Sequence, residues 1–340
     1  MVPALAVAGA LRADGADVVF VGGERAEREL VPAAGYALHP ISVEGLNRSN
    51  PLQALRAALK ALRAVVASVA LLRQLRPDAV MGGGGYVAGP VGAAAVLLRI
   101  PLVLTEADSH LGIANRLLAR FARRVCLAFP TPGREGPRYR VTGRPVPPPF
   151  TDRAAARAQF GIAGDDACVL VFGGSLGARS VNEAAIEAFA DAPFHVIHAS
   201  GQRDYDALAP RVRGPGYDLR PYIDPFGPAL AASDLVVARA GGSIFEIAAH
   251  GRPAILIPYP HATADHQTLN ARWMADAGAA TIVADAELTP EGLARLVASL
   301  LADRGELAAM AHASKALARP QAAAAIAAEL EAAVGVGDDG

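Results

Sequence analysis

Short apolar runs rich in valine and isoleucine alternate along this chain with longer stretches in which alanine and leucine recur at helical spacing. Alternation of this kind predicts repeated strand–helix–strand units, and therefore an α/β fold with parallel sheets. The expected strands lie at residues 18–21, 79–81, 101–105, 124–128, 168–172, 195–199, 235–238 and 254–258.

These strands fall into two groups, separated by the proline-rich segment VTGRPVPPPF at residues 141–150. Proline lacks a backbone N–H and fixes φ, so the segment is incompatible with a helix or a central strand and is expected to be a linker. We therefore expect an N-terminal domain over residues 1–146 and a C-terminal domain over residues 147–318. A last helix and a disordered tail are expected over residues 319–340. In two doubly wound domains, the loops at the carboxyl ends of the strands would face one cleft.

The composition narrows the possible partners. The formal net charge is −1, so the chain lacks the cationic excess that neutralises phosphates, and we expect no nucleic-acid partner.

Cys126 and Cys168 lie in apolar stretches without metal-ligand spacing, which predicts two buried free thiols and no metal site. The sequence has neither an apolar run of about 18 residues nor the layout of a signal peptide, so we expect a cytoplasmic protein.

The strongest chemical signal follows the strand at residues 168–172. The sequence GGSLGARSVNEA places Gly174, Ser175 and Gly177 between this strand and a helix. Glycines let backbone amides approach a diphosphate, and a helix start adds free N–H groups and a positive dipole end. The pattern predicts a phosphate site, although its spacing is neither a P-loop nor GxGxxG, and a tight turn that binds nothing is the alternative.

A second polar cluster follows the next two strands of the C-terminal half. Gly242 and Ser243 open a helix that carries Glu246, and the following loop and helix carry Gln267 and Asn270. Carboxylates and amides at strand ends suit sugar hydroxyls, so the carboxylate is expected on a ribose and the two amides on a hexose. Taken singly, such residues are more often helix caps.

Four motifs together resemble one known family: GGSLGAR-x-x-N, RAGG-S-x-x-E, P-x-P-x-x-x-x-D-H-Q-x-x-N-A and GGGGYVAGP. The chain is similar over nearly its whole length to the bacterial glycosyltransferases that add N-acetylglucosamine to undecaprenyl-diphospho-muramoyl-pentapeptide in peptidoglycan synthesis. The resemblance implies two Rossmann-like domains in a GT-B fold. It also implies UDP-N-acetylglucosamine in the C-terminal domain, an undecaprenyl-linked acceptor in the N-terminal domain, no cofactor, and a peripheral position on the cytoplasmic face of the cell membrane.

The resemblance also assigns roles to individual donor residues. The glycine loop would contact the donor diphosphate, Glu246 the ribose, Ile223 the uracil, and Gln267 and Asn270 the N-acetylglucosamine. Arg239 would support the nucleotide pocket. The implied donor set is Ser175, Gly174, Gly177, Ile223, Arg239, Gly242, Ser243, Glu246, Gln267, Asn270 and Arg144.

A second glycine turn, in VMGGGGYVAGP, would face the acceptor diphosphate. The sequence departs from the family pattern at three places: TEADS replaces HE-x-N, Ser243 stands for a threonine, and Arg144 stands for an asparagine. The implied acceptor set is Gly83, Gly84, Gly85, Tyr86, Glu106, Asp108 and Asn115.

A long helix is expected over residues 51–76. Its leucines and valines recur at helical spacing, while Arg56, Lys60 and Arg63 line another face with few acidic partners. One interpretation is an interfacial helix with cations on anionic headgroups; the other is an amphipathic helix that packs its leucines on the sheet. A lipid-linked acceptor favours contact with an anionic membrane surface.

In the family, the stretch that matches residues 3–7 follows a strand and a glycine-histidine loop, whose histidine is a leading candidate for the catalytic base. The chain begins at Met1, inside the first helix, so we expect the native start upstream and unpaired edges in the N-terminal sheet. We also expect nucleotide-sugar binding with little or no transferase activity. Asp108, His110 and His39 are the remaining candidates for the base.

The expected reaction is an inverting displacement in which the acceptor 4-hydroxyl attacks the anomeric carbon of the donor sugar and UDP leaves. A base must accept the hydroxyl proton, and fixed dipoles must meet the charge of the leaving group. Three alternatives stay open: a GT-B glycosyltransferase with another lipid acceptor, a UDP-N-acetylglucosamine epimerase, and a protein that binds the nucleotide sugar without turnover.

Overall fold

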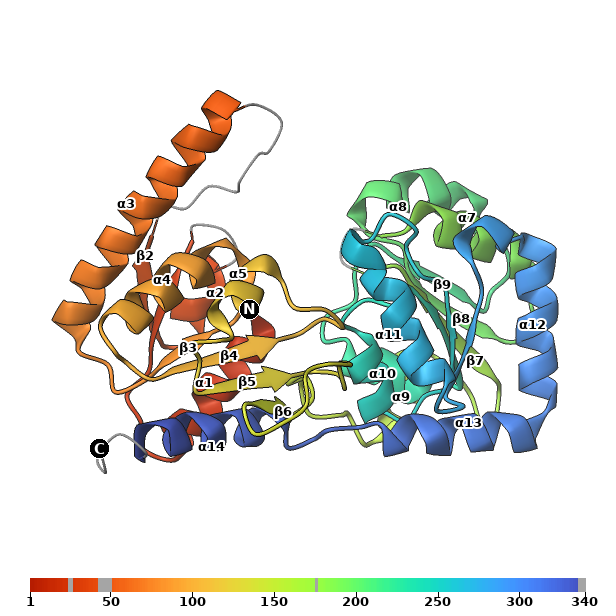
Figure 1. The fold of residues 1–340 in the computed structure, drawn as a ribbon. Helices are drawn as coiled ribbons and strands as arrows, with labels where there is room; N and C mark the ends of the chain where they lie inside the picture. Colours follow the sequence, from red (N-terminus) through yellow and green to blue (C-terminus); the bar gives the residue numbers. More distant parts are fainter. Residues whose placement is uncertain (24–26, 42–50, 175–176, 336–340) are drawn as a thin grey trace. The chain divides into compact units, whose positions relative to one another are not determined.

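The computed structural model describes residues 1–23, 27–41, 51–174 and 177–335. The chain divides into two compact units (Figure 1). Unit 1 comprises Met1–Val146 and Arg319–Gly340, and unit 2 comprises Pro147–Ala318. The first crossing between the units therefore lies in the proline-rich segment. The tail expected to be disordered lies outside the described residues from position 336 onward.

Unit 2 is built on one six-stranded sheet in the order β12-β11-β10-β7-β8-β9. Every neighbouring pair is parallel, so all carboxyl ends of the strands lie at one edge. The central strands β7 and β10 are buried along their whole length, as expected for a parallel sheet covered on both faces. The strands are β7 (Cys168–Phe172), β8 (His195–Ala199), β9 (Tyr217–Arg220), β10 (Leu235–Ala238), β11 (Ala254–Leu256) and β12 (Ala280–Ile282).

Helices cover this sheet. Alternate residues of the central strands, such as Val169 and Val237, pack with Val181 and Val297 from two of the covering helices into one core. The helices of unit 2 are α6 (Arg153–Gln159), α7 (Arg179–Ala188), α8 (Gln202–Leu208), α9 (Gly227–Ala232), α10 (Ile244–Ala249), α11 (His266–Ala275), α12 (Pro290–Ala302) and α13 (Arg304–Ala316), with 3-10 turns η1 (Ala209–Arg211), η2 (Thr263–Asp265) and η3 (Asp285–Glu287).

The strands of unit 1 form two sheets. The first pairs β1 (Val19–Gly22) with β2 (Ala37–Pro40), and the second has the order β3-β4-β5-β6. Within the described residues, β1 and β3 do not pair with each other, so the interrupted sheet expected from the sequence is present. The strands of the second sheet are β3 (Val80–Gly82), β4 (Leu102–Glu106), β5 (Arg124–Leu127) and β6 (Tyr139–Val141).

The last helix of the chain packs in unit 1. Its residues Ile326 and Leu330 share a core with Val7 from the first helix and Val103 from β4. Two arginines of the neighbouring strands, Arg124 and Arg140, form ion pairs with Glu329 at 2.8 and 3.3 Å. The helices of unit 1 are α1 (Val2–Ala13), α2 (Glu27–Ala33), α3 (Pro51–Leu75), α4 (Gly85–Leu97), α5 (Ile113–Leu118) and α14 (Ala322–Gly335).

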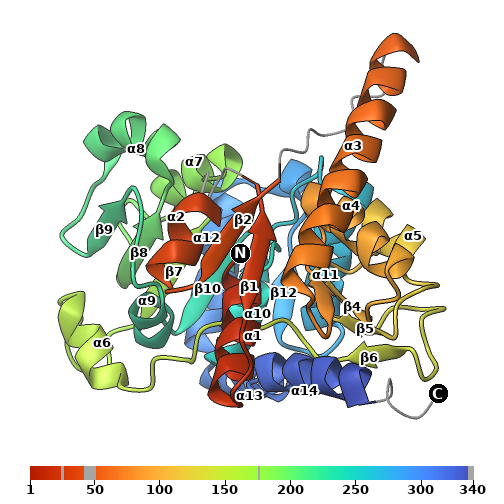
Figure 2. The same cartoon turned by 90° about the vertical axis from the view of Figure 1, so that its left-hand side faces the viewer.

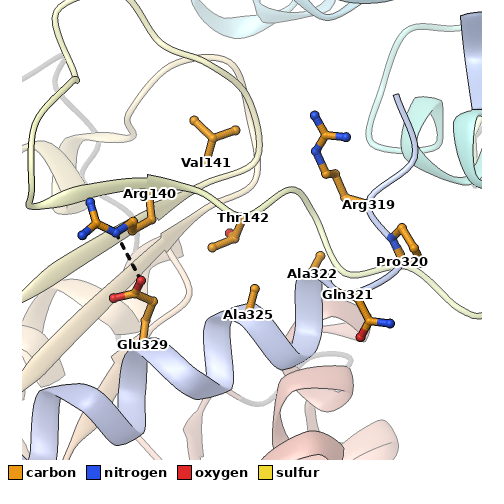
Figure 3. A pocket seen from close by; sticks show the side chains of 9 residues that line it. All are labelled: Arg140, Val141, Thr142, Arg319, Pro320, Gln321, Ala322, Ala325 and Glu329. Atoms are coloured by element: carbon orange, nitrogen blue, oxygen red, sulfur yellow. Dashed lines mark ion pairs between the residues drawn. The ribbon is translucent and has the colours of Figure 1, made fainter. Parts of the chain in front are cut away.

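A surface pocket of about 470 Å³ lies beside the start of α14 (Figure 3). Arg140 and Thr142 line it from the end of β6, and Arg319 and Ala322 line it from the segment that enters α14. A Cβ at Gly143 would collide with Arg319. The segment after β6 and the segment that enters α14 therefore pack together at a position where only glycine fits. The pocket lies wholly within unit 1.

Four strands were not expected from the sequence: β2, β6, β9 and β12. Each is three or four residues long. Strand β9 has the polar sequence YDLR, in which Asp218 and Arg220 form an ion pair at 2.8 Å. Such strands form because a neighbouring strand pairs with them, and local hydrophobicity does not reveal them. Val141, expected in the linker, closes the edge strand β6.

Candidate active site

The glycine loop after β7 follows a path that only glycine can take. A Cβ at Gly173 would collide with Ala178. Gly177 has φ +76°, and a Cβ there would collide with the carbonyl oxygen of Ser200. The N–H of Gly177 donates to the carbonyl of Gly174 at 2.9 Å. Bare backbone is therefore held at the carboxyl end of β7, directly before α7. Ser175, expected to contact the diphosphate, lies outside the described residues.

Arg239 is buried, and its hydrogen bonds go to neighbouring loops. Its Nη1 donates to the carbonyls of Ile257 and Pro258, each at 3.1 Å. Its Nη2 donates to Ser180 Oγ at 2.8 Å, and its Nη1 also forms an ion pair with Asp285 Oδ1 at 2.7 Å. The guanidinium thus ties the segment after β11 to α7. Its role in supporting a nucleotide pocket stays a prediction.

The two amides expected on the sugar also hold loops. Gln267 Oε1 accepts from the N–H of Tyr259 at 3.0 Å. Asn270 is 1% exposed, and its Nδ2 donates to the carbonyl of Ala240 at 3.0 Å, just before the Gly241–Gly242 turn. Asn270 Oδ1 has no hydrogen-bond partner among the described residues. The predicted sugar contacts of both side chains stay predictions.

The remaining donor residues follow β9 and β10. Ser243 is the N-terminal cap residue of α10, and Glu246 lies in the first turn of that helix, partly exposed. Ile223 follows β9 and is buried. Because the strands are parallel, the segments after β7, β9, β10 and β11 meet at one edge of the sheet. The structure therefore brings the described donor residues of unit 2 to that edge, whereas Arg144 lies in unit 1.

A buried polar network lies beneath the glycine loop, and sequence reasoning missed it. His198 Nδ1 lies 2.8 Å from the Tyr217 hydroxyl, and His198 Nε2 lies 3.1 Å from Asn182 Oδ1. Asn182 Nδ2 donates to the Ser200 carbonyl at 2.9 Å and to Asp204 at 3.0 Å. The available signal was the histidine His198 inside strand β8, which directly follows the helix that carries Asn182.

In unit 1, Glu106 organises the loop between β4 and α5. Its Oε1 accepts from the N–H groups of Ala107 at 3.0 Å and Asp108 at 3.4 Å. Its Oε2 accepts from the N–H of Gly112 at 2.8 Å and from Asn115 Nδ2 at 2.9 Å. Four donors thus hold one carboxylate, so the described geometry gives Glu106 a structural role in this loop.

Asn115 brings that loop to the glycine turn before α4. The side chain is buried, its Nδ2 also donates to the Thr105 carbonyl at 2.9 Å, and its Oδ1 has no hydrogen-bond partner among the described residues. A Cβ at Gly84 would lie 3.8 Å from Asn115 Nδ2, and one at Gly83 would lie 3.9 Å from Thr105 Oγ1. Gly84 and Gly85 have φ +78° and +76°. The two acceptor motifs therefore meet.

Of the three candidates for the base, Asp108 and His110 are partly buried in the loop between β4 and α5, and His39 is partly buried in β2. The side chain of Tyr86 lies outside the described part. Within the described residues, no three His, Cys, Asp or Glu side chains form a group that could hold a metal ion. Both cysteines are buried free thiols, as expected, and burial raises the pKa of each to about 12.

Helix α3 contacts α4 through one face, which includes Ala64 and Leu72 (Figure 2). Leu62 and Val66 are 61% and 62% exposed. The alternative in which these apolar side chains pack on the sheet is therefore wrong for both residues. Lys60 is exposed on the same helix, as is Arg63, and the side chain of Arg56 lies outside the described part.

Helix α5 lies on the other side of α4 and also exposes apolar side chains. Ile113, Leu117 and Phe121 are exposed in and just after this helix. Arg116 and Arg120 are exposed among them, and the Arg120 guanidinium lies 4.8 Å from the centre of the Phe121 ring. Apolar and cationic side chains thus occur together on both helices. No helix in the described ranges is long and apolar enough to cross a bilayer.

Family models match both units. The model of the glycosyltransferase family 28 N-terminal domain matches residues 1–127, and the model of the C-terminal domain matches residues 168–326. This chain belongs to glycosyltransferase family 28. The family resemblance that the four motifs indicated is therefore confirmed.

Relatives in family 28 include a protein of Desulforudis audaxviator. It is named UDP-N-acetylglucosamine--N-acetylmuramyl-(pentapeptide) pyrophosphoryl-undecaprenol N-acetylglucosamine transferase, and the two chains are 42% identical over 341 aligned positions. The alignment covers 94% of this chain and 91% of that protein.

Solved structures confirm the predicted fold of two Rossmann-like domains of the GT-B type. The crystal structure of Acinetobacter baumannii MurG matches with a TM-score of 0.79 and 32% identity, over 97% of this chain and 95% of that one. A putative UDP-N-acetylglucosamine 2-epimerase from Listeria monocytogenes matches with a TM-score of 0.73 over 100% of this chain and 95% of that one. Its 15% identity shows a shared fold alone.

Proposed function

We propose that this chain transfers N-acetylglucosamine from UDP-N-acetylglucosamine to the 4-hydroxyl of the muramoyl sugar in undecaprenyl-diphospho-MurNAc-pentapeptide. The observation that carries the proposal is the 42% identity, over 94% of the chain, to a transferase named for this reaction. The glycine loop before α7 and the carboxylate and amides at the same sheet edge supply groups suited to a nucleotide sugar.

The donor would lie along the carboxyl edge of the sheet in unit 2. The backbone N–H groups of the glycine loop and the start of α7 would bind the diphosphate, because both direct positive partial charge at an anion. Glu246 would accept hydrogen bonds from the ribose hydroxyls. Ile223, after β9, would lie beside the uracil. Gln267 would contact the N-acetylglucosamine, and Asn270, which is buried, would support that contact by holding the Ala240 carbonyl.

The acceptor would use the second glycine turn. Gly83 and Gly84 precede α4, a helix of 13 residues that begins at Gly85, and the free N–H groups at this helix start suit the diphosphate of the lipid carrier. Glu106 and Asn115 hold the adjacent loop in place. That loop carries Asp108 and His110, which are the described groups available to accept the proton of the attacking hydroxyl.

The reaction forms one bond and breaks one. The acceptor oxygen bonds to the anomeric carbon of the donor sugar from the face opposite the diphosphate, the C–O bond to UDP breaks, and the configuration inverts. The hydroxyl proton passes to the base, and the electron pair of the broken bond leaves on UDP. The amides of the glycine loop would stabilise that developing charge, because they are already oriented before the reaction begins.

A lipid-linked acceptor requires contact with a membrane, and we assign this contact to the outer surfaces of α3 and α5. Exposed Leu62, Val66 and Phe121 would enter the boundary between headgroups and acyl chains. Lys60 and Arg63 would bind anionic headgroups. The protein would then act as a peripheral protein on the cytoplasmic face of the cell membrane.

The shared fold with UDP-N-acetylglucosamine 2-epimerases makes epimerisation the second candidate. The test incubates the 340-residue chain with UDP-N-acetylglucosamine, with and without the lipid-linked muramoyl-pentapeptide, and measures free UDP, lipid-linked disaccharide and epimerised sugar. We expect slow UDP release that depends on the lipid acceptor, with an equal amount of disaccharide, because the interrupted sheet lies in the acceptor unit. Epimerised sugar formed without acceptor, or UDP release indifferent to acceptor, would contradict the proposal.

A further inference from the structure

Gly177, the last glycine of the loop, packs directly against the backbone carbonyl of Ser200, just after β8. Gly177 lies so close to this oxygen that no Cβ would fit between them. The same oxygen accepts a hydrogen bond from Asn182 Nδ2 at 2.9 Å. The Ser200 oxygen therefore joins Gly177, helix α7 and the end of β8, and the amide of Asn182 helps to set the position of Gly177.

The amide of Asn182 can adopt only one orientation. Its two N–H groups point at acceptors, the Ser200 carbonyl and Asp204 Oδ2. A hydrogen bond from Arg203 lowers the pKa of Asp204, so this acceptor is a carboxylate and the bond is charge-assisted. A flipped amide would place its oxygen against two other oxygens. Asn182 Oδ1 must then accept a hydrogen bond from His198.

The ring of His198 completes the orientation. Burial lowers the pKa of His198 to about 3, so the ring is neutral and only one nitrogen carries hydrogen. Nε2 faces Asn182 Oδ1 at 3.1 Å and must be the donor. Nδ1 is therefore the acceptor, and it receives the Tyr217 hydroxyl at 2.8 Å. The hydrogen bonds run in one direction from Tyr217 through His198 to Asn182.

None of these side chains can touch a ligand. Asn182 and His198 are both 0% exposed, and Tyr217 is 9% exposed. Any effect they have on a bound nucleotide must pass through the backbone that they hold. That backbone is the glycine loop and the start of α7, where the diphosphate would lie.

We propose that Tyr217, His198 and Asn182 are positioning residues for the diphosphate of the donor, because together they fix the Ser200 carbonyl on which the glycine loop rests. This inference rests on the proposed donor site in unit 2. The inference adds three residues that do not contact the ligand. These residues would affect binding of the diphosphate and leave binding of the nucleoside unchanged.

The test is a pair of titrations on the full chain, one with UDP and one with uridine, for the wild type and three variants. Asn182→Ala removes the amide. Tyr217→Phe removes only a hydroxyl and keeps the ring. Ser233→Ala is the matched control, because Ser233 is also buried and donates one hydrogen bond, to the Leu230 carbonyl at 3.0 Å, but precedes β10 at the opposite end of the sheet. Thermal unfolding establishes that each variant is folded at the titration temperature.

We expect Asn182→Ala to weaken UDP binding by about tenfold, because it removes the hydrogen bond to the Ser200 carbonyl. Tyr217→Phe should weaken UDP binding by about threefold, because it keeps that bond but removes the hydroxyl that orients His198. Uridine binding should stay within about twofold in every variant, and Ser233→Ala should leave both ligands unchanged. Should Asn182→Ala fail to fold, the milder Tyr217→Phe carries the test.

Two results for folded variants would overturn the inference: unchanged affinity for UDP, or an equal fall for UDP and uridine. The second result would mean that the network supports the whole unit and has no special link to the loop. A wild-type chain that binds UDP no more tightly than uridine would instead refute the donor site itself, and with it this inference. That failure is visible before any variant is compared.

Discussion

In unit 2 six parallel strands form one continuous sheet, whereas within the described residues the strands of unit 1 form two sheets. Both units nevertheless present a glycine turn at the carboxyl end of a strand, directly before a helix. They hold those turns differently. In unit 2 Gly177 packs on the Ser200 carbonyl, which a buried network holds, and in unit 1 the Glu106 carboxylate gathers four N–H donors from the loop beside the glycine turn.

A buried asparagine recurs in both units. Asn115, Asn182 and Asn270 each donate from Nδ2 to a carbonyl at the end of a strand. Only the oxygen of Asn182, among these three, has a hydrogen-bond partner within the described residues. The amide of Asn182 is therefore oriented by described groups at both its nitrogen and its oxygen, whereas the amides of Asn115 and Asn270 are held through the nitrogen alone.

The largest expected effect is the loss of stability and of UDP binding when the glycine turn of unit 2, rather than that of unit 1, is substituted. Gly177 and Gly85 both have φ +76°, so alanine at either position costs about 1 to 2 kcal/mol of backbone strain. Gly177→Ala also drives a Cβ into the Ser200 carbonyl, whereas a Cβ at Gly85 meets no described atom within 4 Å. We expect Gly177→Ala to lower the free energy of unfolding by roughly 3 to 5 kcal/mol and to abolish measurable UDP binding.

Gly85→Ala is the matched control for strain alone. Urea unfolding gives the stability of both variants, and titration gives their affinity for UDP. Equal behaviour of the two variants would show that the contact with the Ser200 carbonyl is unimportant.

The next effect compares two glutamates. Glu246→Ala should weaken UDP binding about tenfold to a hundredfold, because a hydrogen bond from a ribose hydroxyl to a carboxylate is worth about 1.5 to 3 kcal/mol. Glu106→Gln should leave UDP affinity within about twofold and instead disturb the loop of unit 1, because an amide NH2 would face N–H donors. Unchanged UDP affinity in Glu246→Ala would remove Glu246 from the donor site.

A third prediction concerns the membrane and should affect unit 1 only. Each cation near an anionic surface is worth roughly 1 kcal/mol, so reversal of Lys60 and Arg63 to glutamate should weaken vesicle binding at least about 30-fold. Flotation with vesicles that contain acidic lipid measures the effect. The control reverses Arg295 and Arg304, two exposed arginines of unit 2, with the same change in net charge. Equal losses in both double variants would show that net charge alone drives binding.

The smallest effect is a pH dependence in unit 2. The pKa of His198 is about 3 in the folded chain, against an ordinary value of 6.5, and the pKa of His250 is also lowered, chiefly by burial. As the pH falls, these two histidines therefore become protonated in the unfolded chain at a higher pH than in the folded chain. Stability is therefore complete above about pH 6.5 and is lost as pH falls, by up to about 1.4 kcal/mol per pH unit for each histidine.

Trp273 is the only tryptophan in the sequence and lies in α11 of unit 2, so its fluorescence during urea unfolding reports on that unit. We expect the urea concentration at the unfolding midpoint to decrease as the pH is lowered from 6.5 to 5. In His198→Gln this midpoint should depend less steeply on pH. A midpoint that does not change with pH would show that His198 is not buried as a neutral ring.

The sequence predicted β7, β8 and β10 at their observed bounds, because β7 and β10 are continuous apolar runs and β8 combines valine, isoleucine and alanine with two histidines. It also located the glycine turns, since a strand, a cluster of glycines and a helix are adjacent in the chain. The return of α14 to unit 1 was not predictable, because nothing in an alanine-rich helix names its packing partner. Nor was the exposure of Leu62 and Val66, since helical spacing does not say which face of α3 meets α4.

The site was predictable as a set of segments, and its internal supports were not. The sequence places Asn182 and His198 16 positions apart, and they meet because α7 packs on the sheet that contains β8. Arg239 and Asp285 are likewise distant in the sequence, because one follows β10 and the other follows β12, and they form an ion pair in the folded chain. Such contacts depend on tertiary packing, so local patterns carry little signal for them.

Amide hydrogen exchange on the 340-residue chain would show whether unit 2 binds the donor and unit 1 the acceptor. We predict that UDP slows exchange at residues 177–186 and 240–250 of unit 2 and leaves residues 83–90 and 106–116 of unit 1 unchanged. A soluble diphospho-muramoyl-peptide analogue of the acceptor should give the opposite pattern. Protection by UDP confined to the glycine turn of unit 1, with none in unit 2, would show that the donor does not bind unit 2.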